Sequence, residues 1–236
     1  MADALASPGG SGKHESRREQ CKLAVAVPRA AKTQRRTRIQ AEREELILGA
    51  ALEVFAAHGF RGATIDQIAE QAGMSKPNLL YYFPNKEIMH RMLIDRLLET
   101  WLEPLRKLDP EGEPLTEIRS YIRRKLEMAR DYPRESRLFA NEILQGAPRI
   151  ADELEDLKKL VDEKAKVIGR WIERGKLARV DPYHMIFSIW ATTQHYADFD
   201  VQVCTVLGPK RSGEGRFEDA ARYLDQLFVG GLKPKA

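Results

Sequence analysis

The 236-residue sequence contains no long run of apolar residues and only two cysteines. A membrane-spanning helix needs about 20 consecutive apolar residues, so none is predicted. The first residues, rich in Ala, Ser, Pro and Gly, do not form the apolar core of a secretory signal, and we therefore expect a cytoplasmic protein. Cys21, in the first segment, and Cys204, on an expected helix, stand in no metal-ligand spacing. We expect both to be free thiols, and we expect no metal site.

The sequence also lacks the alternation of apolar and polar residues that is typical of β-strands, and it contains no internal repeat. Helical periodicity recurs instead, interrupted by glycine and proline. We therefore predict an all-α fold, with a small three-helix domain over residues 37–84 and a larger helical domain over residues 85–232. Residues 1–36 show no sustained periodicity and are predicted to be a disordered basic tail.

Local signals set the expected boundaries of several helices. Thr37 and Gln40 are spaced as a capping box, and the helix that follows should end at His58-Gly59. Asn85 should cap a long helix that Pro104 kinks or ends. Pro148 is expected to begin another helix, and Asp181-Pro182 is expected to begin one that runs to about Leu207.

Basic residues are unevenly distributed, and they are outnumbered by acidic ones over residues 39–100. The formal charge is +4, but residues 1–38 carry nine Lys or Arg against three Asp or Glu, whereas residues 39–100 carry six against nine. Contacts of residues 39–100 with phosphates would therefore depend on local placement. The tail, which includes Arg35, Arg36 and Arg38, could add a salt-sensitive attraction to nucleic acid or serve only as a solubilising extension.

Residues 64–87 contain the most informative motif. Thr64 and Gln67 form a second capping box, and apolar residues at positions 65, 68, 69 and 72 predict a helix with one buried face. Gly73 allows the chain to turn, Ser75 can cap the next short helix, and Pro77 is tolerated in its first turn. A tight turn between two short helices is typical of a helix-turn-helix, whose second helix reads the DNA major groove.

Four residues of that second helix are left to face solvent or DNA: Lys76, Asn78, Tyr81 and Tyr82. The run from Gly59-Phe60 through Thr64-Ile65, Ile68-Ala69, Ala72-Gly73, Ser75, Leu80-Tyr81-Tyr82-Phe83 and Lys86-Glu87 resembles the DNA-binding region of the TetR family of bacterial repressors. This resemblance implies a transcriptional repressor rather than an enzyme. It also implies a homodimer joined through its last helices and a palindromic double-stranded operator.

DNA contacts are expected from the following residues: Arg61, Thr64, Ser75, Lys76, Asn78, Tyr81, Tyr82 and Lys86. Asn78 and Lys76 should lie nearest the base edges. The hydroxyls of Thr64, Tyr81 and Tyr82, with the Lys86 ammonium, should hold phosphates. Pro77 departs from the pattern of the family and puts the operator sequence in doubt.

The larger domain has features of a small-molecule site. Trp190 and Gln194 are four residues apart and share a helix face, and Trp101 lies on the helix that leaves the three-helix domain. Two indoles and an amide could clamp a flat polar heterocycle, and a glutamine amide can pair with the edge of uracil. The alternative for the two tryptophans is ordinary core packing, since tryptophan most often buries area.

Further segments of the larger domain resemble a TetR subgroup that regulates pyrimidine utilisation. They include Trp101-Leu102, Arg130-Asp131-Tyr132-Pro133, Ser136-Arg137-Leu138-Phe139, Gly146-Ala147-Pro148, Gly175-Lys176-Leu177-Ala178 and Thr193-Gln194-His195-Tyr196-Ala197-Asp198-Phe199. The resemblance implies uracil or thymine as effector, held by Trp101, Trp190 and Gln194 with Leu98 nearby. It implies no other cofactor.

Other functions stay open on the sequence alone. His195 and Asp198 could form a proton relay or metal site, although a structural pair is the simpler interpretation because no third ligand is evident. An enzyme with an appended helix-turn-helix would need more catalytic groups than this pair provides. A constitutive architectural DNA-binding protein would lack an internal cavity. A regulator that senses a larger hydrophobic compound is the main alternative within the family.

Overall fold

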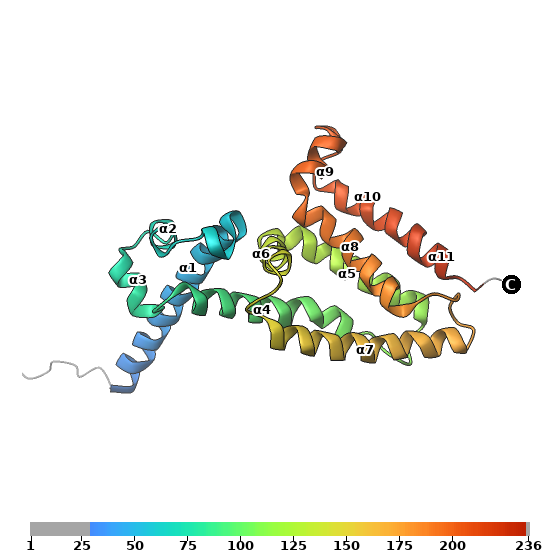
Figure 1. Ribbon diagram of the computed structural model, residues 1–236, viewed down its shortest axis with the longest axis horizontal. Coiled ribbons are helices and arrows are strands. Elements are labelled where there is room, and N and C mark those ends of the chain that lie inside the picture. Colours follow the sequence, from blue (N-terminus) through green and yellow to red (C-terminus); the bar gives the residue numbers. More distant parts are fainter. Residues whose placement is uncertain (1–28, 235–236) are drawn as a thin grey trace, which may run out of the picture. The chain divides into compact units, whose positions relative to one another are not determined.

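A computed structural model describes the backbone of residues 29–234 and the side chains of residues 38–234 (Figure 1). Within these residues the chain is helical, contains no strand, and includes no helix long and apolar enough to cross a membrane. The helices are α1 (Arg29–Gly62), α2 (Ile65–Gln71), α3 (Lys76–Tyr82), α4 (Lys86–Arg106), α5 (Pro114–Asp131), α6 (Pro133–Leu144), α7 (Ala151–Glu173), α8 (Pro182–Asp198), α9 (Asp200–Leu207), α10 (Gly215–Leu224), the π-helical turn η1 (Asp225–Val229) and α11 (Gly230–Leu232). The all-α prediction is confirmed.

The chain divides into two units, residues 1–43 and residues 44–236, which are described separately. In the first unit, helical backbone begins at Arg29 and not after residue 36, so the predicted tail was too long and Thr37 does not begin a helix. Arginine, alanine, lysine and glutamine are strong helix formers, which explains the extension of α1. Arg38 and Glu42 add an i,i+4 ion pair of 2.9 Å. Cys21 and residues 1–28 lie outside the described residues.

The three-helix portion of the second unit forms as its sequence predicts. The helical geometry of α1 is broken at Gly59, where a φ of 65° favours glycine. Both hydrogen bonds of the Thr64–Gln67 capping box are present at the start of α2. Gly73, with a φ of 64°, makes the turn into α3. Ser75 precedes α3 without a side-chain cap, whereas Asn85 does cap α4, accepting a 3.0 Å bond from the Ile88 N–H.

Two apolar cores lie along the second unit. The first joins α1, α2, α3 and α4 as far as Leu102 to Met128, Leu138 and Ile150, so the three-helix portion shares a core with the larger portion. The second core lies among the end of α4 and helices α5, α7, α8 and α10. In the ribbon, α5 lies among α4, α6, α8 and α10, with which it makes contacts (Figure 1).

Two expected boundaries of the larger portion differ from the structure. The helix predicted to run from Asp181 to Leu207 is broken at Phe199 into α8 and α9. The helix expected at Pro148 begins only at Ala151, after Ala147 adopts a positive φ of 54°. The final helix contains the π-helical turn η1. Such breaks depend on packing rather than on local signals, which explains why periodicity missed them. Pro104 lies within α4, close to its end.

A cluster of charged and aromatic side chains joins the end of α1 to α4 and to the turn before α7. The Phe60 ring is contacted by two cations, the Arg149 guanidinium at 3.6 Å and the Lys86 ammonium at 4.6 Å from its centroid. The same ammonium donates to the carbonyl oxygens of Phe60 (2.8 Å) and Ala63 (2.7 Å). Lys86, from the start of α4, and Arg149, from the turn before α7, therefore hold the Phe60 ring, and Lys86 also holds the two carbonyl groups. We call this cluster the Phe60 junction.

A buried carboxylate completes the Phe60 junction. Glu142 on α6 is 1% exposed and accepts bonds from both the Arg149 backbone N–H (3.1 Å) and its guanidinium (3.0 Å). His90 on α4 lies 3.6 Å from the same carboxylate, its ring edge-on to Phe60. Burial lowers the pKa of His90 to about 4, although the Glu142 carboxylate opposes this shift. The imidazole is therefore neutral at pH 7, and Arg149 balances the buried carboxylate.

The His90 pKa predicts loss of stability in acid. Between its ordinary value of 6.5 and about 4, the unfolded imidazole binds a proton that the folded one does not, so stability falls as pH falls through this window. We expect the wild-type protein to lose up to about 3 kcal/mol more than His90→Gln between these pH values. Urea denaturation at stepwise pH measures the difference. Parallel losses in the two proteins would contradict the assignment to His90.

Candidate functional site

The exposed side of α3 carries the groups expected to read DNA. Leu79 is fully buried and anchors the helix, while Lys76, Asn78 and Tyr81 are exposed, Tyr81 by 76%. Tyr82 is half-buried and meets Tyr81 edge to face, with ring centroids 5.2 Å apart. A short helix held from behind by an apolar residue and presenting an amide, an ammonium and a phenol is suited to a major groove.

Three of the expected DNA contacts are engaged with protein groups. The Lys76 ammonium forms a 2.9 Å ion pair with Asp66 on α2, which is exposed and can exchange for a phosphate. The Thr64 hydroxyl belongs to the capping box. Lys86 differs most from its prediction, because its half-buried ammonium is held by the Phe60 and Ala63 carbonyls and the Phe60 ring. The structure therefore gives Lys86 a role in the Phe60 junction instead of a free position for a phosphate.

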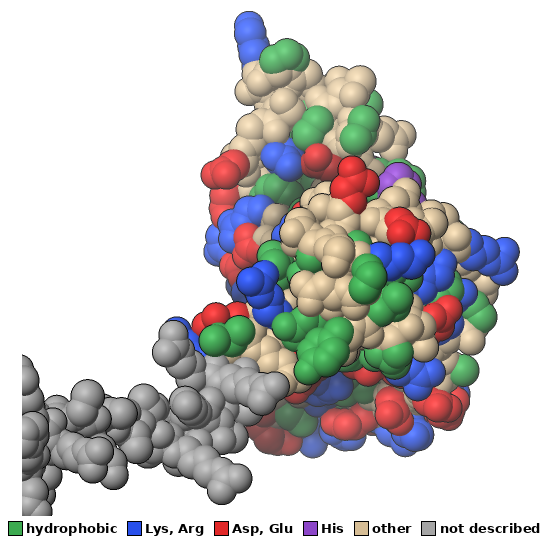
Figure 2. Space-filling view, turned by 90° about the vertical axis from the view of Figure 1, so that its left-hand side faces the viewer, with side chains coloured by type: hydrophobic (Ala, Val, Ile, Leu, Met, Phe, Trp, Pro, Cys, Tyr) green, Lys and Arg blue, Asp and Glu red, His purple; other side chains and the backbone are tan. Residues whose placement is uncertain are grey.

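Figure 2 looks at the side of the molecule on which α2 and α3 lie in Figure 1. Lys and Arg side chains are interspersed there with acidic and apolar ones and form no continuous basic surface. This agrees with the excess of acidic residues over residues 39–100. Arg61, near the end of α1, and Ser75, directly before α3, are both exposed. Attraction to DNA by this portion of the chain thus depends on a few placed groups rather than on net charge.

Trp101, the first residue expected to bind ligand, lies beside a cavity. Its side chain is 7% exposed and lines a cavity of about 260 Å³ between α1, α4 and the start of α6. The Trp101 indole Nε1 is buried and has no hydrogen-bond partner, and neither has the Glu135 Oε2 atom, which belongs to another lining residue. Buried polar atoms are nearly always paired, so an unpaired donor and acceptor beside a cavity point to a ligand or water.

Two polar residues on α5 lie against the two indoles, and the sequence analysis missed both. Tyr121 and Lys125 are four residues apart and share one face of α5. The Trp190 Nε1 donates a 2.6 Å bond to the Tyr121 hydroxyl, and the Lys125 ammonium lies 4.5 Å from the centroid of the Trp101 ring. Both residues interrupt an apolar stripe that includes Ile118, Ile122 and Ala129. A lysine within such a stripe was the signal that could have found them.

The environment of Lys125 is apolar with one nearby acid. Its side chain is 2% exposed, and burial lowers its pKa to about 7, opposed by the Asp198 carboxylate. Asp198 is itself bound by the Ser136 hydroxyl at 2.5 Å, and partial burial raises the pKa of its carboxyl. His195 stacks on Phe199, and its effect on Asp198 is electrostatic, lowering the pKa of that carboxyl, with no hydrogen bond between the two among the described residues. Asp198 thus interacts with Ser136 on α6 and with Lys125 on α5.

The structure places the four residues predicted to bind ligand in different surroundings. Leu98 packs into the first core, Trp101 lines the 260 Å³ cavity, and Trp190 packs against the second core. Gln194 lines a different cavity, of about 650 Å³, together with Asp198 and the chain around Gly59. Trp190 and Gln194 both lie on α8, but sequence spacing could not show that α5 contacts both Trp101 and Trp190.

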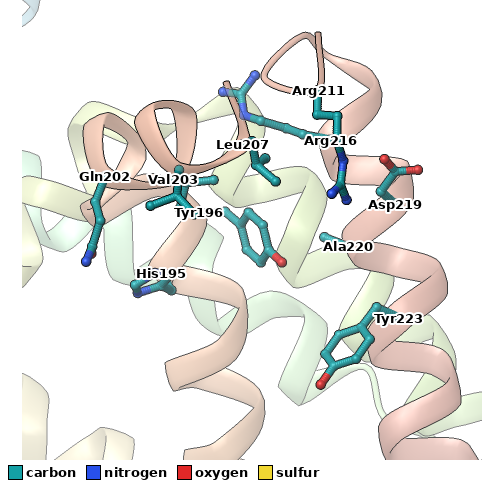
Figure 3. Close-up of a pocket in the computed structure, with 11 residues that line it drawn as sticks. His195, Tyr196, Gln202, Val203, Leu207, Arg211, Arg216, Asp219, Ala220 and Tyr223 are labelled. Carbon is teal, nitrogen blue, oxygen red and sulfur yellow. The ribbon is translucent and has the colours of Figure 1, made fainter. Parts of the chain in front are cut away.

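Another cavity, of about 490 Å³, lies between α8–α9 and α10 (Figure 3). Tyr196 points from α8 toward α10, while Arg216 and Asp219 approach from α10. The Arg216 guanidinium is fixed by Asp200 at 2.8 Å. Cys204, on α9 as expected, is a free thiol whose Sγ lies 3.5 Å from an Asp200 oxygen. Among the described side chains of residues 38–234, no group of His, Cys, Asp and Glu could hold a metal ion.

Comparison with known proteins identifies the family. Residues 47–89 match the family model described as bacterial regulatory proteins, tetR family, and residues 94–235 match YcdC-like protein, C-terminal region. The HTH-type transcriptional regulators RutR of Escherichia coli K12 and O157:H7 are each 47% identical over 204 residues, covering 86% of this chain and 96% of theirs. The chain is a TetR-family DNA-binding transcriptional regulator. The expectation that it is not an enzyme agrees with these relatives.

Solved structures of low sequence identity share the fold. KstR2 of Mycobacterium tuberculosis, a ketosteroid transcriptional regulator, gives a TM-score of 0.62 at 22% identity, covering 82% of this chain and 96% of its own. AibR, solved with isovaleryl coenzyme A and operator DNA, gives a TM-score of 0.61 at 18% identity, covering 80% and 99%. These likenesses extend over both the reading helices and the helical body of this TetR-family chain.

Asn78→Ala tests the reading face. An amide that pairs with a base edge is worth about 1–3 kcal/mol of discrimination, so we expect roughly tenfold or greater loss of affinity for a duplex selected with the wild-type protein. Fluorescence anisotropy at fixed salt measures the affinity. Lys159→Ala, which removes an exposed lysine on α7, is the control and should bind normally. Equal affinity of the Asn78 variant and wild type would remove Asn78 from the reading face.

Proposed function

We propose that this TetR-family regulator is a dimeric repressor whose release from a palindromic operator is controlled by a pyrimidine base such as uracil or thymine. The resemblance of its helical body to regulators of pyrimidine utilisation supplies the ligand class. The observation that carries the proposal is the Trp101 indole, which lines a cavity with its N–H buried and unpaired.

The position of Trp101 links ligand binding to the reading helices. Helix α4 carries Lys86 of the Phe60 junction at its first residue and Trp101 four turns later. The cavity beside Trp101 is also lined by Leu48 and Leu52 of α1. A base bound there contacts both α1 and α4, so it favours one arrangement of these helices over another. Such couplings are typically about 1–3 kcal/mol, or roughly five- to 150-fold in operator affinity.

Operator affinity with and without uracil tests the ligand. We expect saturating uracil to weaken binding of the wild-type protein to its selected duplex at least fivefold, in line with couplings of about 1 kcal/mol or more. Trp101→Leu should bind the duplex but lose this response. Adenine, a purine of larger area, is the control ligand and should have no effect. Unchanged operator affinity in saturating uracil and thymine would refute the ligand assignment.

The proposed dimer rests on apolar side chains exposed along the last helices. They are Tyr183 and Phe187 on α8, Phe199 beside it, Val201 and Val206 on α9, Tyr223 on α10 and Leu227 on η1, each between 40% and 82% exposed. Clustered exposed apolar residues of this size mark interaction surfaces in soluble proteins. A two-fold partner packed on these helices would cover them and set two reading helices at the spacing of a palindrome.

A double substitution tests the dimer. Phe187→Arg with Leu227→Arg places two charges on the proposed interface, and we expect the mass measured by light scattering to fall from that of a dimer to that of a monomer. Operator binding should weaken with it. Leu144→Arg, at an 84% exposed apolar residue on α6, is the matched control and should remain dimeric. A monomeric wild-type protein at micromolar concentration would refute the dimer.

A further inference from the structure

Lys125 is a buried cation without a hydrogen-bonding role in the fold. Its side chain, near the centre of α5, is 2% exposed. Within the described residues its ammonium lies over the face of the Trp101 ring and interacts electrostatically with the Asp198 carboxylate. Neither interaction is a hydrogen bond, although an ammonium carries three donors. Burying such a group costs stability, and an apolar residue of similar length would fill the same space at lower cost. A lysine here is thus poorly explained by folding alone.

Lys125 reaches the proposed effector site through Trp101, which lines the 260 Å³ cavity, whereas Lys125 is not one of the residues that line it. The ammonium is 4.5 Å from the centroid of the Trp101 ring, the indole whose own Nε1 is unpaired beside a cavity. Two donors without hydrogen bonds therefore lie at the same indole: the Trp101 N–H at its edge and the Lys125 ammonium over its face. When Lys125 is protonated, the Asp198 carboxylate balances its charge, so the site favours a ligand that is itself neutral.

We propose that Lys125 is a ligand-binding residue of the effector site, and that it and Trp101 together select a neutral pyrimidine that carries two ring carbonyl groups. This inference rests on the proposed function. A planar base stacked on Trp101 takes the place that the ammonium holds over the indole, and the ammonium then donates to a carbonyl oxygen at the edge of the base. The Trp101 N–H is available to the second carbonyl oxygen. Cytosine, which has an amino group in place of one carbonyl, leaves one donor without an acceptor.

Thermal shift and calorimetric titration of the full-length chain with uracil measure the role of Lys125. Lys125→Met removes the ammonium and keeps an apolar side chain of similar length. We expect this variant to melt at a higher temperature than wild type, because a buried charge is removed, and to bind uracil at least about tenfold more weakly. A merely structural lysine would not combine higher stability with weaker binding. Lys164→Met is the matched control, since Lys164 is 5% exposed on α7 and should leave uracil affinity unchanged.

The wild-type protein provides a second measurement that depends on no variant. Uracil and thymine should bind, and cytosine should bind at least about tenfold more weakly, since an unpaired buried donor costs a charge-assisted hydrogen bond. Equal affinity for cytosine and uracil would overturn the selection of two carbonyl groups. Unchanged uracil affinity in a folded Lys125→Met would overturn the role of Lys125 while leaving the proposed function intact. Absence of uracil binding by wild type would refute both.

Discussion

The contact of one phenylalanine ring with two cations holds the reading helices to the helical body. Phe60 stands just beyond the break in α1, and its ring and carbonyl are held by Lys86 at the start of α4 and by Arg149 before α7. Cation–π contacts of this kind are worth about 0.5–2 kcal/mol each, and more when desolvated. The buried Glu142 carboxylate orients Arg149, and loss of either partner would leave an uncompensated charge. The geometry of the reading helices therefore depends on a cluster in which the buried carboxylate and both cations have partners.

A second set of polar groups surrounds Trp101, and more of its donors and acceptors lack hydrogen-bond partners than in the Phe60 junction. In the Phe60 junction the carboxylate and both cations have partners, although the His90 Nδ1 atom is buried and unpaired. Around Trp101, an indole N–H, a glutamate oxygen and a lysine ammonium lack hydrogen bonds from the described residues. The two sets lie along the same helix, α4. The proposed effector would act on the reading helices through this shared helix, by favouring one arrangement of its two ends.

Much of the fold could be predicted from the sequence because its signals are local. The Thr64–Gln67 box, the glycine at 73 and the Asn85 cap depend on residues three or four positions apart, and all three are present in the structure. The start of α1 was misplaced because helix extension requires no special signal once a helix has formed. The break at Phe199 was missed because the apolar pattern continues through it.

The sequence by itself determined an all-α fold with a helix-turn-helix, because short-range caps, turns and helical periodicity are sufficient for these features. The regulator class followed from the resemblance of this region to the TetR family. The sequence also identified Asn78 and Trp101 as residues to examine. Only the tertiary structure decided that Lys86 holds the Phe60 junction, that α5 contacts both Trp101 and Trp190, and that Lys125 lies over an indole. Those contacts join residues 23 or more positions apart, as for Lys86 and Ala63. No local pattern records which helix faces pack together, because that choice is made by the shape and burial of the assembled core.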